Sequence, residues 1–160
     1  MDPLPFGLSR ETQIRRDARG RWFDGDVEIE HPRIREAFDR WIDRAEDGRY
    51  ILKNATHWAY VAIEGPPVWV RRAKPLGVGV ELELSDGRTE ALDPTTLRQD
   101  LEGRLYATVR GGQMPAGFTR QAGADLMDLL EEDGEQIVLV LGAARIPIEV
   151  RAAPLELPGG

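Results

Sequence analysis

Apolar residues recur with a helical period in the first third of the chain. After Pro32, six apolar side chains fall at positions 0, 3, 4, 7, 8 and 11 of one run. This spacing places them on a single face of an α-helix. They are Ile34, Ala37, Phe38, Trp41, Ile42 and Ala45. We therefore predict an amphipathic helix that begins at Pro32 and is ended by Asp47-Gly48.

Alternation with a period of two predicts strands elsewhere. Residues 78–84 alternate Val or Leu with Gly or Glu, which is typical of a strand with one face in water. Ile137–Leu141 is apolar on both faces and predicts a central strand, paired with residues 145–150. Turn residues at Asp24-Gly25 and at 85–88 predict tight hairpins. Further strands are expected in residues 12–17, 21–23, 27–29, 49–53, 57–63, 68–71 and 105–109.

A second helix is expected after Thr119, whose hydroxyl can cap the free N–H groups of the first turn. Its apolar stripe is Ala122, Leu126, Leu129 and Leu130. The boundary between the two parts of the chain is placed at Lys74-Pro75-Leu76-Gly77, because proline and glycine interrupt the pattern there.

The order of these elements indicates an internal repeat. Gly20-Arg21-Trp22-Phe23 precedes the first helix and Asp47-Gly48, whereas Gly103-Arg104-Leu105-Tyr106 precedes the second helix and Asp133-Gly134. The two glycine-to-aspartate intervals, 47 − 20 = 27 and 133 − 103 = 30, are similar. We predict an α+β fold of two related halves, each an antiparallel β-meander packed with one main α-helix. The halves span residues 12–75 and 76–152, and the termini at 1–11 and 153–160 are expected to be loose.

Composition limits the classes of function. Hydrophobic residues make up 41% of the chain and charged residues 31%, as in soluble globular proteins. The net charge of −7 makes nucleic-acid binding unfavourable. Cysteine is absent, which excludes disulfides, thiolate nucleophiles, zinc fingers and iron–sulfur clusters. Without a signal-like N-terminus or a long apolar run, we expect a cytoplasmic protein with no membrane segment.

Motifs that carry chemistry are not found. His31 and His57 are far apart and have no carboxylate at a ligand spacing, so neither a metal nor another cofactor is expected. Ser9 and Ser85 are not in a nucleophile elbow. Gly77-Val-Gly79 precedes a charged strand instead of a helix that could bind phosphate.

Two tryptophans provide the candidate binding residues. Trp58 and Trp69 are predicted on neighbouring strands, and Arg71 follows the second of them. Aromatic faces beside guanidinium groups bind small anions or the surface of a partner protein. With His57 at the start of the first strand, the candidate set is His57, Trp58, Trp69 and Arg71. The alternative is that these rings fill the core, as large aromatic side chains commonly do.

Several segments resemble an uncharacterised proteobacterial family, the domain of unknown function 1285 (DUF1285). The first half carries the stronger match, in Ile14–Asp17, Gly20–Phe23, the helix after Pro32, Asp47-Gly48, and Val61–Glu64 with Pro67. The second half matches more weakly, in Asp93-Pro94, Leu97-Arg98, Leu105–Arg110 and Asp125-Leu126. Near its end the family has a Trp-Ser-Gly-Gly turn, where this chain has Leu141–Arg145. The resemblance implies a two-part α+β fold with repeated motifs, no established activity and a role in signalling.

Three hypotheses about function remain open at this point. The first is a non-enzymatic module that binds a small ligand or a protein partner in the crevice between its halves, with a regulatory output. The second is an enzyme whose acid/base site uses dispersed Asp and Glu residues with His57 in the same crevice. The third is a structural subunit, for which a broad exposed apolar patch would be typical. The sequence does not indicate the oligomeric state.

Overall fold

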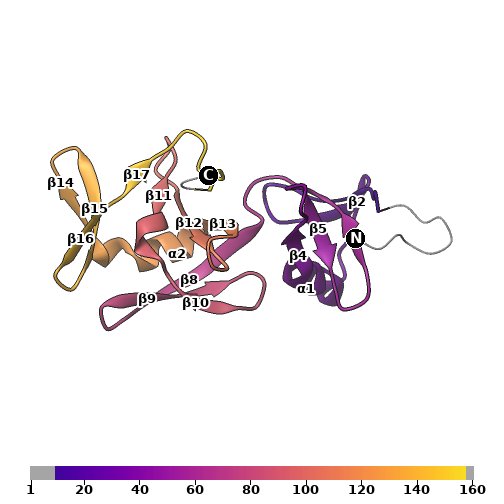
Figure 1. Cartoon of the computed structure of the whole chain (residues 1–160), viewed down its shortest axis with the longest axis horizontal. Helices are drawn as coiled ribbons and strands as arrows, with labels where there is room; N and C mark the ends of the chain where they lie inside the picture. The colour runs from indigo at the N-terminus through magenta and orange to yellow at the C-terminus, as the bar shows by residue number, and fades with distance from the viewer. Residues whose placement is uncertain (1–9, 158–160) are drawn as a thin grey trace. The chain divides into compact units, whose positions relative to one another are not determined.

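The computed structural model describes residues 10–157 and shows a mixed α+β protein, built mostly of strands with two α-helices (Figure 1). This confirms the predicted fold class. The chain divides into two compact units between Gly65 and Pro66, and we call residues 10–65 the N-terminal unit and 66–157 the C-terminal unit.

The N-terminal unit contains two small sheets and one helix. Its sheets have the strand orders β3-β2-β1-β7 and β4-β5-β6. Its elements are β1 (Ile14–Arg16), β2 (Trp22–Asp24), β3 (Val27–Glu28), α1 (Pro32–Trp41), β4 (Ile42–Arg44), β5 (Tyr50–Lys53), β6 (Trp58–Tyr60) and β7 (Ala62–Ile63).

The C-terminal unit contains a seven-stranded and a three-stranded sheet. Their strand orders are β10-β9-β8-β13-β12-β11-β17 and β14-β15-β16. The elements of its first part are β8 (Val68–Leu76), β9 (Gly79–Leu84), β10 (Thr89–Ala91), η2 (Pro94–Thr96), β11 (Arg98–Gln99), β12 (Leu105–Val109) and β13 (Met114–Phe118). After these come α2 (Arg120–Asp125), η3 (Met127–Leu129), β14 (Leu130–Asp133), β15 (Gln136–Leu141), β16 (Ala144–Pro147) and β17 (Glu149–Val150).

The boundary between the units lies about ten residues before the predicted one at Pro75. In the structure Pro75 belongs to β8, where it pairs with Val80 of β9. The other neighbour of β8 is β13, which pairs only with Val68–Val70. Pro75 therefore lies in a part of β8 that pairs with a neighbouring strand on one side. Such an edge position tolerates the missing N–H group of proline.

The two units share one order of strand pairing. In the N-terminal unit β1 pairs with β2 in antiparallel fashion and with β7 in parallel. In the C-terminal unit β11 pairs with β12 in antiparallel fashion and with β17 in parallel. In both, the helix follows the third strand of this series and leads into a three-stranded antiparallel sheet. The parallel pairs depart from the purely antiparallel meanders that were predicted, because their partners come from the far end of each unit.

The turn after the first strand of each series is also the same. Asp17 Oδ1 accepts hydrogen bonds from the backbone N–H groups two and four residues later, at 3.0 and 2.8 Å. Asp100 Oδ1 accepts the equivalent two bonds, each at 2.9 Å. Gly20 and Gly103, three residues after each aspartate, have φ values of 84° and 87°. Only glycine adopts this left-handed conformation without a steric penalty, so both turns depend on it.

Both helices are shorter than predicted. The first ends at Trp41, and Ile42 turns to an extended conformation (φ −58°, ψ 128°) and pairs with Leu52 of β5. Asp47-Gly48 lies in the turn between β4 and β5 instead of ending the helix. Ile42 and Ala45 fitted the helical period because both side chains are buried. Ile42, however, is buried as a residue of β4, and Ala45 as a residue of the turn that follows it. The second helix likewise ends at Asp125, before Leu126, Leu129 and Leu130.

Several local predictions are confirmed. Pro32 is the first residue of α1, and Thr119 Oγ1 caps α2 by accepting a hydrogen bond from Ala122 N–H at 3.1 Å. The turns at Asp24-Gly25 and at residues 85–88 form hairpins, and Ile137–Leu141 lies in β15, the central strand of its sheet.

The core of the N-terminal unit centres on Trp22, whose side chain is fully buried. Its ring packs edge-to-face against Phe38 of α1, with 5.2 Å between centroids. Its Nε1 donates a 3.0 Å hydrogen bond to Asp39 Oδ1, which also accepts one from Arg16 Nη1 at 3.1 Å. Aromatic packing and a shared carboxylate therefore fix α1 on the sheet.

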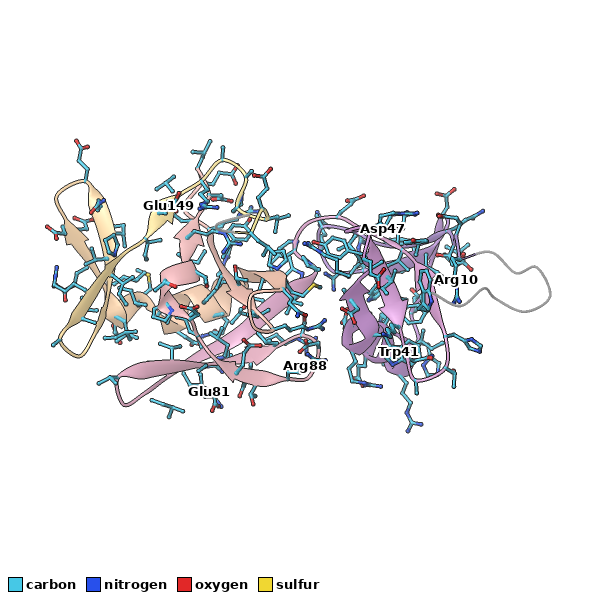
Figure 2. The ribbon with its side chains drawn as sticks, in the orientation of Figure 1. Arg10, Trp41, Asp47, Glu81, Arg88 and Glu149 are labelled. Carbon is cyan, nitrogen blue, oxygen red and sulfur yellow. The ribbon has the colours of Figure 1, made fainter. Side chains whose placement is uncertain are left out.

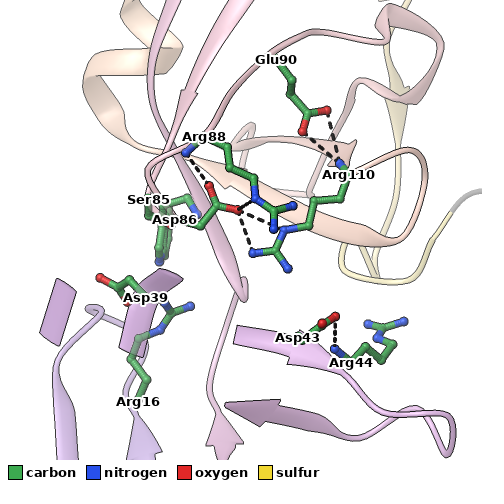
Figure 3. Close-up of polar contacts among 10 residues, drawn as sticks. Arg16, Asp39, Asp43, Arg44, Ser85, Asp86, Arg88, Glu90 and Arg110 are labelled. Atoms are coloured by element: carbon green, nitrogen blue, oxygen red, sulfur yellow. Dashed lines mark hydrogen bonds and ion pairs between the residues drawn. The ribbon is translucent and has the colours of Figure 1, made fainter. Parts of the chain in front are cut away.

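A buried ion pair joins two turns of the C-terminal unit (Figure 3). Asp86, in the β9–β10 turn, accepts hydrogen bonds from Arg110 Nε at 3.0 Å and Nη2 at 2.7 Å. The Arg110 N–H group, at the end of β12, donates to the Glu90 carboxylate at 3.0 and 3.2 Å. Arg110 has a φ of 54°, the one positive value outside glycine in the described residues. These bonds hold it in a conformation that is strained for a residue with a Cβ.

Asp125 links α2 to β8, and we expect it to make folding sensitive to acid. Its carboxylate accepts hydrogen bonds from Arg72 Nε at 2.8 Å and from Ala73 N–H at 2.9 Å. These two bonds hold the pKa of Asp125 well below its usual range, and the bond from Arg72 has the larger effect. A lowered folded-state pKa stabilises the protein above the unfolded value of about 3.9, and this stabilisation disappears as the pH falls through the folded value.

The corresponding variant is Asp125→Asn, compared with wild type by urea denaturation from neutral pH to about pH 3. We expect the variant to be less stable at neutral pH and the difference to shrink below about pH 4. A difference that is constant with pH would exclude this role for Asp125.

Candidate functional site

The four candidate residues predicted from the sequence fall in two different units. His57 and Trp58 belong to the N-terminal unit, and Trp69 and Arg71 belong to the C-terminal unit. The prediction that the tryptophans lie on neighbouring strands is wrong, because β6 pairs with β5 whereas β8 pairs with β9 and β13. The run predicted as one strand, residues 57–63, forms β6 and β7 in two different sheets.

Trp69 and Arg71 are held by backbone contacts along β8. The Trp69 N–H group donates to Ser85 Oγ at 2.9 Å, and its carbonyl accepts from Ser85 N–H at 2.8 Å. Arg71 is exposed, and its carbonyl accepts a 3.3 Å bond from Thr119 Oγ1. These bonds explain the local course of β8 and do not single out the two side chains as binding groups.

Trp58 lies in a cluster of aromatic and guanidinium groups on the N-terminal unit. Its ring meets Tyr60, two residues along β6, edge-to-face with 5.2 Å between centroids. The Arg10 guanidinium lies 4.2 Å from the Trp58 ring centroid, and that of Arg49 lies 3.6 Å from the Tyr60 ring centroid. With two carboxylates these residues form what we call the Arg–aromatic face, part of which is labelled in Figure 2. Its members are Arg10, Glu11, Asp47, Arg49, Trp58 and Tyr60.

The segment 10–12 positions this face by running beside β6. The Arg10 carbonyl accepts a hydrogen bond from Tyr60 N–H at 2.8 Å, and Arg10 Nη1 donates to the Trp58 carbonyl at 2.8 Å. Thr12 Oγ1 donates to the Tyr60 carbonyl at 2.6 Å. The polar backbone groups of this edge strand are thereby satisfied, and its two aromatic side chains are fixed.

An ion pair and a hydrogen bond fix the outer part of the face. Arg49 donates to both Glu11 oxygens at 2.7 and 2.9 Å, and the Tyr60 hydroxyl donates to Asp47 Oδ2 at 2.7 Å. The bond from Arg49 lowers the pKa of Glu11, and the bond from Tyr60 lowers the pKa of Asp47. The same bond to Asp47 raises the pKa of Tyr60. The face therefore carries two cations and two carboxylates at neutral pH.

This charge balance determines what the face can bind. Both aromatic rings already have a guanidinium over one side, and Arg49 already has a carboxylate. A free small anion would have to compete with Glu11, so the anion-binding alternative is unfavourable here. Aromatic and arginine side chains with polar groups around them are typical of protein interfaces.

His57 borders the face but is held through its backbone. Its N–H group donates to Asn54 Oδ1 at 2.8 Å, and its carbonyl accepts from Asn54 N–H at 3.0 Å. Its side chain is exposed. No group of three or more His, Cys, Asp or Glu side chains within residues 10–157 is arranged to hold a metal ion. In that same part of the chain no helix has the length and apolarity needed to cross a membrane.

Two solved structures have the same fold as this chain. One is a DUF1285 family protein from Silicibacter pomeroyi DSS-3, with a TM-score of 0.67 and 20% sequence identity over 91% of this chain and 87% of that one. The chain has the DUF1285 fold. A second DUF1285 protein, from Shewanella baltica OS155, matches with a TM-score of 0.58 and 13% identity over 75% of this chain and 94% of that one. No protein-family model and no curated protein matches the sequence. The resemblance to DUF1285 inferred from the sequence is thus confirmed in the fold.

Proposed function

We propose that the protein is a non-enzymatic binding module with a regulatory role, and that its N-terminal unit binds a protein partner through the Arg–aromatic face. The observation that carries this proposal is the edge-to-face pair of Trp58 and Tyr60, with the guanidinium groups of Arg10 and Arg49 over their rings. Trp, Tyr and Arg are the residue types that contribute most to binding energy at protein interfaces.

The preorganisation of the face supports the proposal. Side chains that are ordered before binding lose less conformational entropy when a partner docks. The ion pair between Arg49 and Glu11 and the bond between Tyr60 and Asp47 restrict the face in this way. These contacts lie at the surface and contribute little to stability by themselves. An ordered surface arrangement that adds little to the stability of the fold favours a role in recognition.

We expect Trp58→Ala to lower the affinity for the partner by about tenfold or more, because a central aromatic side chain is lost. The partner is first captured in the native host by a photo-crosslinking amino acid at position 57, then purified. Its affinity for the full chain is measured by isothermal titration calorimetry. Capture alone does not test the proposal; the affinity ratio between variant and wild type does.

The control is Val78→Ala, which truncates an apolar side chain that is 75% exposed in the C-terminal unit. We expect it to bind the partner as wild type does. Circular dichroism of both variants checks that they fold. If Trp58→Ala folds and binds with wild-type affinity, the Arg–aromatic face is not the binding surface.

We also propose that the two units arose from one duplicated motif. Support comes from the shared pairing order, with β1–β7 and β11–β17 as equivalent parallel pairs, and from the shared aspartate-glycine turn. Cross-strand nuclear Overhauser effects test both pairs, and the absence of either pair would remove this support. The crevice predicted between the halves, and the acid/base alternative there, stay predictions.

A further inference from the structure

One face of the seven-stranded sheet in the C-terminal unit carries a row of polar side chains. Arg98 of β11 is paired with Tyr106 of β12 on one side and with Glu149 of β17 on the other. Residues directly opposite each other on adjacent strands share a face of the sheet. Thr108 and Arg151, each two residues along from a member of this row, belong to the same face.

Arg98 is buried on this face, and its hydrogen bonds within residues 10–157 go to neutral oxygens. Its side chain is among the largest that are fully buried, at 1% exposure. Its Nε donates to the Pro154 carbonyl at 2.6 Å, and its Nη1 donates to the Thr96 carbonyl at 2.8 Å and to Thr108 Oγ1 at 3.1 Å. Its Nη2, also buried, has no hydrogen-bond partner in residues 10–157.

A second guanidinium lies close enough to affect the first. Burial lowers the pKa of Arg98, and the positive charge of Arg151 lowers it further, while Glu149 opposes both. Arg151 Nε is 3.0 Å from Glu149 Oε1, and the Arg151 backbone N–H group donates to the Gln99 carbonyl at 2.8 Å. The Glu149 side chain is mostly exposed, so it compensates only part of the charge of two neighbouring cations.

A buried cation needs a compensating group. Transfer of an ionised side chain out of water is costly unless opposite charge and hydrogen bonds replace the lost hydration. Three neutral oxygens satisfy part of the Arg98 guanidinium, and the two Nη2 hydrogens are left over. An oxyanion can accept charge-assisted hydrogen bonds from these remaining Nη2 hydrogens and supply the missing negative charge.

We propose that Arg98 and Arg151 form a subsite for a small oxyanion, a carboxylate or a phosphate, which accepts hydrogen bonds from Arg98 Nη2. The C-terminal segment 151–157 follows β17 and covers Arg98 through the carbonyl of Pro154. Its backbone bond to the sheet runs from Arg151 N–H to the Gln99 carbonyl. Few bonds therefore have to open for an anion to enter. This site lies in the C-terminal unit and does not depend on the Arg–aromatic face.

The test uses the full chain with arginine side-chain nitrogens labelled for NMR, titrated with inorganic phosphate in one arm and succinate in the other. We expect a saturable shift of the Arg98 Nη resonances, with a Kd below about 1 mM for at least one anion. Binding of phosphate alone or of succinate alone supports the subsite and identifies its ligand class. If neither anion shifts these resonances, an internal water compensates Arg98 and the proposal is wrong.

Two variants separate the subsite from a general charge effect. Arg151→Met removes the second cation at a partly exposed position, and we expect it to weaken binding at least tenfold while the protein stays folded. Arg145→Met removes an exposed arginine of the same unit that pairs with Glu131, and it should bind as wild type does. Equal affinities of the Arg151→Met variant and wild type would overturn the proposal. This comparison does not require a variant of the buried Arg98, whose replacement can prevent folding.

Discussion

Replacing Asp86 by alanine is expected to lower the free energy of unfolding by about 3 to 5 kcal/mol. The Asp86 side chain is fully buried, and Arg110 is 7% exposed. Removing the carboxylate leaves the Arg110 guanidinium without the two bonds that Asp86 accepts. It also leaves the strained Arg110 backbone without one of its anchors. Urea denaturation followed by circular dichroism measures the loss.

An exposed ion pair of the same unit supplies the control. Glu131 and Arg145 are 3.3 Å apart and each about half exposed, so Glu131→Ala is expected to cost less than about 1 kcal/mol. The double variant Asp86→Ala with Arg110→Met removes the uncompensated charge and should recover part of the loss. If the Asp86→Ala and Glu131→Ala variants unfold at the same urea concentration, the ion pair does not have the structural role given to it here.

Trp22→Ala is expected to cost a similar amount, about 3 to 5 kcal/mol, in the N-terminal unit. The side chain is fully buried, so the truncation leaves a large cavity beside Phe38 and removes the donor to Asp39. Thermal unfolding gives the change in stability. Val27→Ala, at a position that is 71% exposed in the same unit, is the matched control and should be close to neutral.

A Trp22→Phe variant gives an intermediate point between the full side chain and its truncation to alanine. It keeps an aromatic ring in the core but removes the hydrogen bond to Asp39 and part of the ring volume, so we expect a loss between those of the two alanine variants. A Trp22→Ala variant as stable as Val27→Ala would mean that Trp22 is not central to the core of its unit.

Local chemistry in the sequence predicts local structure well in this protein. The cap at Thr119 and the turn at Asp24-Gly25 are correct because a hydroxyl and a glycine act within a few residues. The ends of the helices are not correct, because Ile42 is buried equally well as a strand residue paired with Leu52. Tertiary pairing decided between two conformations that the apolar period does not distinguish.

The sequence did not show all members of the Arg–aromatic face, because some of them come from distant positions in the chain. Trp58 was a candidate from the sequence, and Tyr60 follows it with the period of a strand. Arg10 and Glu11, however, reach the face from 48 and 38 positions away from their partners Trp58 and Arg49. Trp69 and Arg71 were grouped with Trp58 because they are close in sequence, although a boundary between units lies between them.

The most direct test of the proposed function is hydrogen–deuterium exchange of the full chain with and without the captured partner. We predict slower exchange in β6 and in the adjoining segment 10–12, whose backbone groups are bonded to each other under the Arg–aromatic face. Exchange in β14–β16 serves as the internal reference and should not change. Protection confined to residues 66–157, with β6 unaffected, would contradict the proposal that the N-terminal unit binds the partner.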